Sequence, residues 1–140
     1  MAWPEDYVGT GLGHLEVFVM KSDGTEETRL TYDEFRDHDP AWSDDGKKLV
    51  FETATRPGNI IVGKWGIRTI SIAAEEPKNV LFNDAVNLMA QWLPNGEKLI
   101  FQQVAYLKNR AQLFLINGDG SNQVPVTDGK YDDKEVNLLP

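Results

Sequence analysis

A short phrase of sequence occurs twice in this chain, and its two copies lie 50 residues apart. The first copy covers residues 39–51 (DPAWSDDGKKLVF) and the second covers residues 89–101 (MAQWLPNGEKLIF). A repeat at fixed spacing is typical of stacked supersecondary units, each of which buries its apolar faces against its neighbours. The repeat therefore predicts a modular fold. Its anchors are the pairs Trp42 and Trp92, Gly46 and Gly96, Lys48 and Lys98, Leu49 and Leu99, and Phe51 and Phe101.

The sequence between these anchors alternates short β-branched and aromatic runs with turn residues, and it shows no helical period. Strands of this length, four to a unit and separated by turns, predict an all-β fold of four-stranded antiparallel meanders. Asp-Gly and Asn-Gly pairs supply the positive backbone angles that tight turns need. The expected strands cover residues 15–20, 28–31, 40–43, 47–53, 60–72, 77–82, 88–92, 98–104, 112–116 and 124–127.

Weaker copies of the repeat appear near both ends of the chain. Residues 2–6 resemble residues 41–45, with a short strand expected at 7–10, and residues 136–138 repeat residues 86–88 at the same offset of 50. We therefore expect units at about 1–37, 38–86 and 87–131, with a fourth unit beginning at 132–140. Pro77 stands where the other units have a turn glycine, which predicts an irregular outer hairpin in the second unit.

These phrases resemble the WD40-like (PD40-type) propeller repeat of the TolB-like family, closely at residues 39–51 and well at 92–101, 18–31 and 114–127. The resemblance implies about three blades of an open or partial β-propeller. Three blades leave sheet edges exposed instead of closing a ring. We therefore expect either a fragment of a longer propeller or a protomer that completes its ring with other copies.

The charge of the chain restricts the partners that it can bind. Its formal net charge is −8, which repels a phosphate backbone, so we expect no nucleic-acid partner and favour a basic protein surface or a cation. The chain contains no cysteine, which excludes disulfides and thiolate chemistry. It shows neither a signal peptide nor an apolar run long enough for a membrane span.

In the propeller geometry that the family implies, the loops that lead into each first strand gather on one face. That face is acidic and contains one of the two histidines, so it could bind a basic segment of a partner or a cation, or it could simply be solvated. Asp37, His38 and Asp39 alone supply too few ligands for a metal site, and we expect neither a metal nor a cofactor. The candidate binding residues are Arg36, Asp37, His38, Asp39, Arg56, Asp84, Asn87, Lys108, Arg110 and Asp132.

No catalytic motif is present in the sequence. Ser43 or Ser71 could be combined with a histidine on paper, but the Gly-x-Ser-x-Gly elbow is missing and Ser43 belongs to the repeat. The glycines at 9–13 and the Asn-Gly-Asp-Gly run at 117–120 fit connections and turns better than phosphate or calcium loops. We therefore expect no enzymatic activity from this chain.

The repeated aromatic residues are expected to pack one blade against the next, and not to stack a ligand. On that interpretation Trp42→Ala costs roughly 3–5 kcal/mol.

The function that the resemblance implies is a non-enzymatic protein-interaction scaffold, located in the periplasm or elsewhere outside the cytoplasm. The alternative is the propeller part of a larger enzyme, either a prolyl-oligopeptidase-type peptidase or a TolB-like lyase. A weaker alternative is a carbohydrate-binding module. Fold alone does not choose between them.

Overall fold

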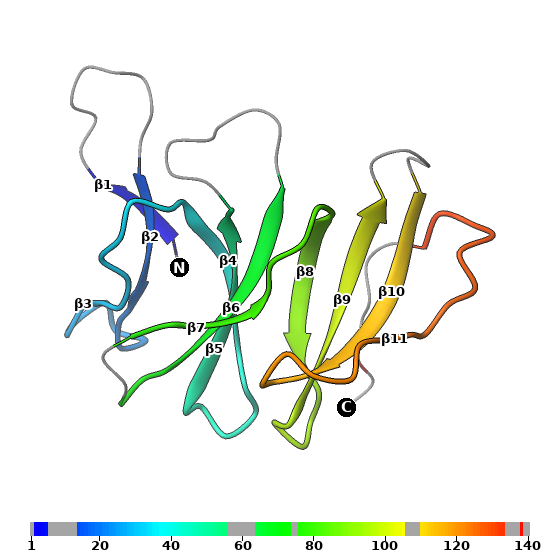
Figure 1. The fold of residues 1–140 in the computed structure, drawn as a ribbon. Helices are drawn as coiled ribbons and strands as arrows, with labels where there is room; N and C mark the ends of the chain where they lie inside the picture. The colour runs from blue at the N-terminus through cyan, green and yellow to red at the C-terminus, as the bar shows by residue number, and fades with distance from the viewer. Residues whose placement is uncertain are drawn as a thin grey trace.

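The computed structural model describes residues 2–5, 14–55, 64–73, 76–105, 110–133 and 138. Within these residues the chain forms strands and turns and no helix, as the sequence predicts (Figure 1). The strands are β1 (Ala2–Glu5), β2 (His14–Val19), β3 (Thr28–Arg29), β4 (Asp37–Trp42), β5 (Lys48–Ala54), β6 (Trp65–Ser71), β7 (Lys78–Leu81), β8 (Val86–Trp92), β9 (Lys98–Ala105), β10 (Arg110–Asn117) and β11 (Val124–Pro125).

The strands form antiparallel meanders that follow the order of the chain. β1, β2 and β3 make one sheet, which we call blade 1. The other strands run β4-β5-β6-β7 and β8-β9-β10-β11, and we call these meanders blade 2 and blade 3. A single parallel pair, Trp65 with Val86, connects β6 to β8. The three sheets stand side by side in Figure 1, and the arrangement is that of an open, partial β-propeller.

Equivalent turns close the hairpins of all three blades. Gly24, Gly46, Gly96 and Gly120 each adopt a positive φ, and each amide donates a hydrogen bond to the carbonyl three residues earlier. The preceding Asp or Asn accepts a further hydrogen bond from the amide two residues on, which fixes the turn. The turn chemistry that the sequence predicts is therefore present at every one of these sites.

The core lies between the blades. Successive side chains of a strand point to opposite faces of the sheet. Leu49 and Phe51 of β5 accordingly pack toward blade 1, against Val17 and Leu30. Val50 points the other way, into a second cluster that blade 2 shares with Trp92, Leu99 and Phe101 of blade 3. The two clusters form two seams, and blade 2 contributes to both.

The two repeat tryptophans occupy unequal environments. Trp92 is 5% exposed, as expected, and the ammonium of Lys48 lies 4.4 Å from its ring centroid. Trp42 is 49% exposed, so the expectation that it is buried at a seam is wrong. The side chain of Trp42 instead lines an open pocket beside the β2–β3 hairpin of blade 1, with Met20, Ser22 and Leu49.

The register of β1 also corrects the expected equivalence at the N-terminus. Ala2 of β1 pairs with Val17 of β2. The corresponding pair in blade 2 is Glu52 of β5, its second strand, with Ile67 of β6. Residues 2–5 therefore take the position of a second strand, and the interpretation of residues 2–6 as a copy of residues 41–45 is wrong. The strand expected at 7–10 lies outside the described residues, as does most of the fourth unit expected at 132–140.

The outer hairpin of blade 2 is irregular, as Pro77 predicts. β7 pairs with β6, but the register shifts between Ile67 and Arg68. In the described part of the chain, no helix is long and apolar enough to cross a membrane.

Truncation of the two tryptophans should have different effects on stability. We expect Trp92→Ala to lower the free energy of unfolding by roughly 3–5 kcal/mol, because it empties a buried seam position. We expect Trp42→Ala to cost less than about 2 kcal/mol, because half of its ring is already in water. Urea unfolding of both variants measures the difference, and equal losses would contradict the assigned seams.

Candidate functional site

The candidate site lies at the end of the blades where the first strands begin. Asp37 at the start of β4 pairs with Thr53 near the end of β5, and Val86 at the start of β8 pairs with Val104 near the end of β9. In Figure 1 this strand-start end is the upper end, and the Asp-Gly and Asn-Gly turns that follow β4 and β8 lie at the lower end. Loops of neighbouring blades therefore meet at the strand-start end.

A bulge interrupts the first strand of both complete blades at equivalent positions. Asp39 has a φ of 50° and Met89 has a φ of 57°, and the strand register shifts beside each of them. A left-handed residue in a strand breaks the alternation of side chains. The bulge therefore allows the consecutive residues His38 and Asp39 to turn toward the same partner.

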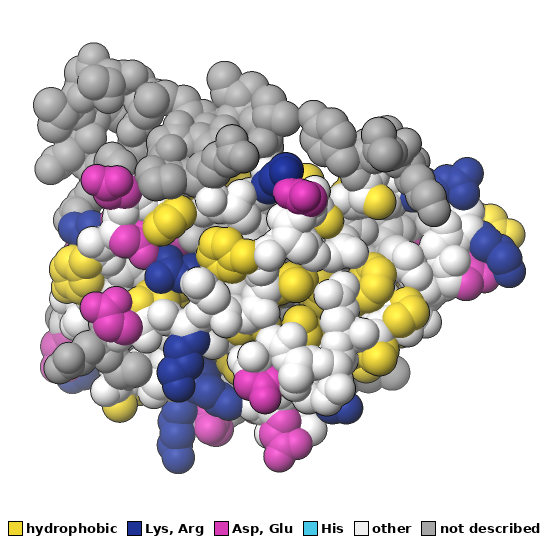
Figure 2. Space-filling model, viewed as in Figure 1, with side chains coloured by type: hydrophobic (Ala, Val, Ile, Leu, Met, Phe, Trp, Pro, Cys, Tyr) yellow, Lys and Arg dark blue, Asp and Glu magenta, His cyan; other side chains and the backbone are white. Residues whose placement is uncertain are grey.

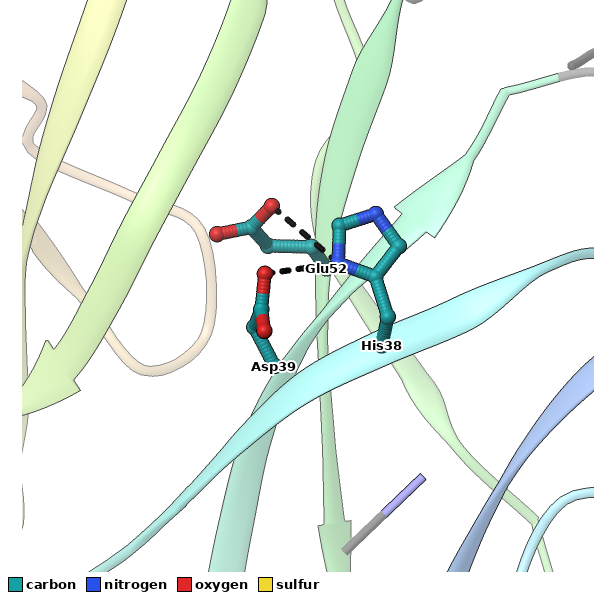
Figure 3. A group of neighbouring side chains, drawn as sticks. All are labelled: His38, Asp39 and Glu52. Carbon is teal, nitrogen blue, oxygen red and sulfur yellow. Dashed lines mark hydrogen bonds and ion pairs between the residues drawn. The ribbon is translucent and has the colours of Figure 1, made fainter. Parts of the chain in front are cut away.

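That partner is Glu52, on the neighbouring strand β5. His38 Nδ1 lies 2.9 Å from Asp39 Oδ2 and 3.6 Å from Glu52 Oε2. Figure 3 shows the three side chains converging from two strands. On its other side, the imidazole of His38 meets the Trp65 ring edge-on, with 4.3 Å between centroids. We call His38, Asp39 and Glu52 the acid–histidine group, and Trp65 packs against its imidazole.

Burial perturbs the carboxyl group of Glu52. Its side chain is 1% exposed, and desolvation, opposed by a hydrogen bond from the Met89 amide and reinforced by the charge of Asp39, raises its pKa to about 8. The Met89 amide belongs to blade 3 and donates to Glu52 Oε1. Glu52 therefore belongs both to the acid–histidine group and to the joint between blades 2 and 3.

Arg68 of blade 2 connects to the residues that follow blade 1 and also lies near a second buried carboxylate, Asp37. The guanidinium of Arg68 on β6 donates to Asp33 at 2.6 Å and lies 3.8 Å from Asp37. Burial raises the pKa of Asp37 to about 6 despite this cation. Asp37 is fully buried, so its side chain is not exposed at the surface of this structure.

The remaining predicted residues fall into different environments. Asn87 is buried, donates to the Trp65 carbonyl and to Asn83, and accepts from Gln103, so it holds the loop into blade 3. Asp132 accepts a hydrogen bond from the Ala111 amide, and Arg110 donates to the Lys130 carbonyl. The remaining placements are as follows: Asp84 is exposed and pairs with Lys64, the Arg36 carbonyl accepts from the Ala54 amide, and Arg56 and Lys108 lie outside the described residues.

Glu52 is the site residue that the sequence interpretation missed. It lies on the buried strand β5, where a charged side chain needs a partner. The residue at the equivalent position of blade 3 is the uncharged Gln102. Direct pairing of His38 with Glu52 across the sheet is set by strand register. The available signal was a glutamate that directly follows the apolar residues Leu49, Val50 and Phe51 in an expected strand.

Comparison with known proteins agrees with this architecture. No protein-family model matches the chain. The chain is 23% identical over 115 residues to the Tol-Pal system protein TolB of Desulfosudis oleivorans (strain DSM 6200 / JCM 39069 / Hxd3), covering 82% of this chain and 24% of that protein. It therefore spans about a quarter of the length of that relative.

Solved structures show the same fold. A structure assigned to TolB from Agrobacterium tumefaciens matches with a TM-score of 0.64 and 20% identity, over 86% of this chain and 45% of that one. TolB from Acinetobacter baumannii matches with a TM-score of 0.65 and 12% identity, over 81% and 27%. The GH74 xyloglucanase of Xanthomonas campestris matches with a TM-score of 0.57 and 11% identity, over 83% and 18%.

The class that the fold and the comparisons define is the open, partial β-propeller. Within that class the chain is TolB-like, and its similarity covers only part of the length of the TolB proteins. At 11% identity the likeness to the xyloglucanase shows the fold alone.

The raised pKa of Glu52 predicts how stability depends on pH. Between pH 4.5 and about 8 the folded state keeps a proton that the unfolded state has lost, so stability falls as pH rises through this range. The slope from this one group is at most about 1.4 kcal/mol per pH unit. Glu52→Gln removes the titration, and we expect a flatter profile in urea unfolding at pH 5, 7 and 9 in metal-free buffer.

The control for this measurement is Asp44→Asn, which removes an exposed carboxylate from the turn at the opposite end of β4. It should keep the wild-type slope. If Glu52→Gln also keeps that slope, the carboxyl group does not titrate in the raised range.

Proposed function

We propose that this chain is a non-enzymatic protein-interaction scaffold of the TolB-like propeller class, and that its partner docks at the strand-start end. The observation that carries the proposal is a pair of exposed side chains on the two equivalent bulges. The Asp39 side chain is 68% exposed and Met89 is 44% exposed, on neighbouring blades. The Met89 amide and the Asp39 carboxylate both meet the Glu52–His38 group, so the pair lies on one patch.

This patch combines an acidic and an apolar group, which suits a partner segment carrying a basic and an apolar side chain. The formal net charge of −8 favours the approach of such a segment. Figure 2 shows acidic side chains mixed with lysines and arginines over the described part of this face. The positive charges there would repel a basic partner segment and offset the attraction of the acids. The exposed Asp39 and Met89 side chains are what favour the strand-start end as the docking surface.

The placement of the serines supports a non-enzymatic role. Ser43 Oγ is buried and is bonded to Asp45 and to the Lys48 carbonyl, at 2.7 and 3.1 Å. Ser71 pairs with Lys48 at the same lower end of blade 2. His38 lies near the opposite end of β4, five residues before Ser43, which separates them by roughly 16 Å along an extended strand. Neither serine can share a proton with His38.

The resemblance to TolB supports a proposal for the kind of partner and for the compartment. The curated relative is named as a component of the Tol-Pal system, and we propose that this chain likewise acts by binding a protein outside the cytoplasm, in the periplasm.

A photo-crosslinking experiment tests this function. We expect a benzoyl-phenylalanine at position 89 to crosslink a defined host protein, because Met89 lies on the proposed docking patch. The same probe at position 44, on the exposed turn at the other end of β4, is the matched control and should give no such product. Mass spectrometry identifies the product, and Asp39→Lys should reduce its yield at least tenfold.

Equal crosslinking from positions 44 and 89, or none from either, would contradict the proposed surface. Turnover of a peptide or polysaccharide by the purified chain would contradict the non-enzymatic role.

A further inference from the structure

Three side chains with metal-ligating atoms converge at the bulge of β4, and we propose that His38, Asp39 and Glu52 bind a divalent transition-metal ion such as Zn²⁺. The ligand atoms would be His38 Nδ1 and one carboxylate oxygen each from Asp39 and Glu52. These atoms lie within 4.8 Å of one another. The inference does not depend on the proposed protein partner.

The spacing of the ligand atoms fits a common metal. Zinc lies about 2.0–2.2 Å from nitrogen and oxygen ligands, so two ligands of a tetrahedral ion stand roughly 3.3 Å apart. The distances from His38 Nδ1 to the Asp39 and Glu52 oxygens are 2.9 and 3.6 Å, on either side of that value. Small side-chain rotations can equalise them. One imidazole and two carboxylates suit zinc better than calcium, which takes six to eight oxygen ligands.

The state of Glu52 is an independent reason to expect a cation. Its side chain is 1% exposed, and Oε2 accepts no hydrogen bond from any described residue. That oxygen is turned toward His38 (Figure 3). A buried carboxyl oxygen without a hydrogen-bond partner costs free energy, and a cation that takes the place of the carboxyl proton would recover it. Oε1 is already held by the Met89 amide, so the carboxylate is oriented with its second oxygen facing the proposed ion.

Blade 3 provides a comparison within the same molecule. Its bulge has the same backbone conformation at Met89, and Leu88 pairs with Gln102 as His38 pairs with Glu52. None of these three residues offers an imidazole or a carboxylate. The fold therefore builds the bulge without the ligand set, and the acid–histidine group is a feature of blade 2 alone among the two complete blades.

Three protein ligands leave at least one coordination position for water or for another molecule. The Asp39 side chain is 68% exposed, so that position faces the surface. His38 would ligate through Nδ1 and carry its proton on Nε2. An ion here would also tie blade 2 to blade 3, because Glu52 holds the Met89 amide.

Isothermal titration of metal-free protein with Zn²⁺ tests the site. We expect one ion to bind per chain, and His38→Gln and Glu52→Gln each to weaken binding at least about tenfold. Glu52→Gln keeps an oxygen that can accept from the Met89 amide, so the joint between the blades survives the substitution. Circular dichroism and thermal unfolding in chelator confirm that both variants fold.

Two control variants make the outcome decisive. Asp44→Asn removes one exposed carboxylate away from the site, and His14→Gln removes the only other histidine of the sequence. Both should bind Zn²⁺ as the parent does. Absence of one-to-one binding to the parent chain, or binding that survives both His38→Gln and Glu52→Gln, would overturn the proposal.

Trp65 supplies a local readout besides affinity. Its ring contacts His38, so a paramagnetic Co²⁺ ion bound at Nδ1 should quench its fluorescence. We expect saturable quenching in the parent chain, and its loss in both Trp65→Phe and His38→Gln. Undiminished quenching in Trp65→Phe would place the ion beside another tryptophan and contradict the site.

Discussion

The burial of apolar side chains between neighbouring blades is the interaction on which the whole structure depends. Each blade is a single sheet with two apolar faces, and no helix in the described residues covers either face. Blade 2 illustrates the consequence: Phe51 points into one seam and Val50 into the other. Because alternate residues serve opposite seams, a blade is stable only where a neighbour supplies matching side chains. Trp42, which lies beside the β2–β3 hairpin of blade 1, is half exposed.

The candidate site is a product of the same packing. The bulge at Asp39 gives two consecutive residues a common direction, and the adjoining seam buries Glu52 beside them. The Met89 amide from the next blade then orients the carboxylate. Glu52, whose pKa is raised, therefore meets His38 and the exposed Asp39 where blades 2 and 3 join. The proposed partner surface and the proposed metal site share this location.

Much of the fold could be predicted from the sequence, because turn glycines and alternating strands act locally. Asp45 and Gly46 set their turn wherever the blade is placed, and the repeat identified equivalent positions without any structure. The exposure of Trp42 could not be predicted, because it depends on how blade 1 packs beside β4 and not on a local pattern. Glu52 was missed for a similar reason: its approach to His38 depends on cross-strand pairing and on a positive φ at Asp39, neither of which has a local signature.

The most direct test of seam packing compares two equivalent turn glycines. Gly24 and Gly120 both have a positive φ, so alanine strains the backbone similarly at each. An added Cβ at Gly24 meets nothing within 4 Å, whereas at Gly120 it would lie 2.4 Å from the Val80 carbonyl oxygen of blade 2. If blades 2 and 3 pack as described, urea unfolding will show that Gly120→Ala costs about 1–3 kcal/mol more than Gly24→Ala. Equal costs would contradict the contact between these blades.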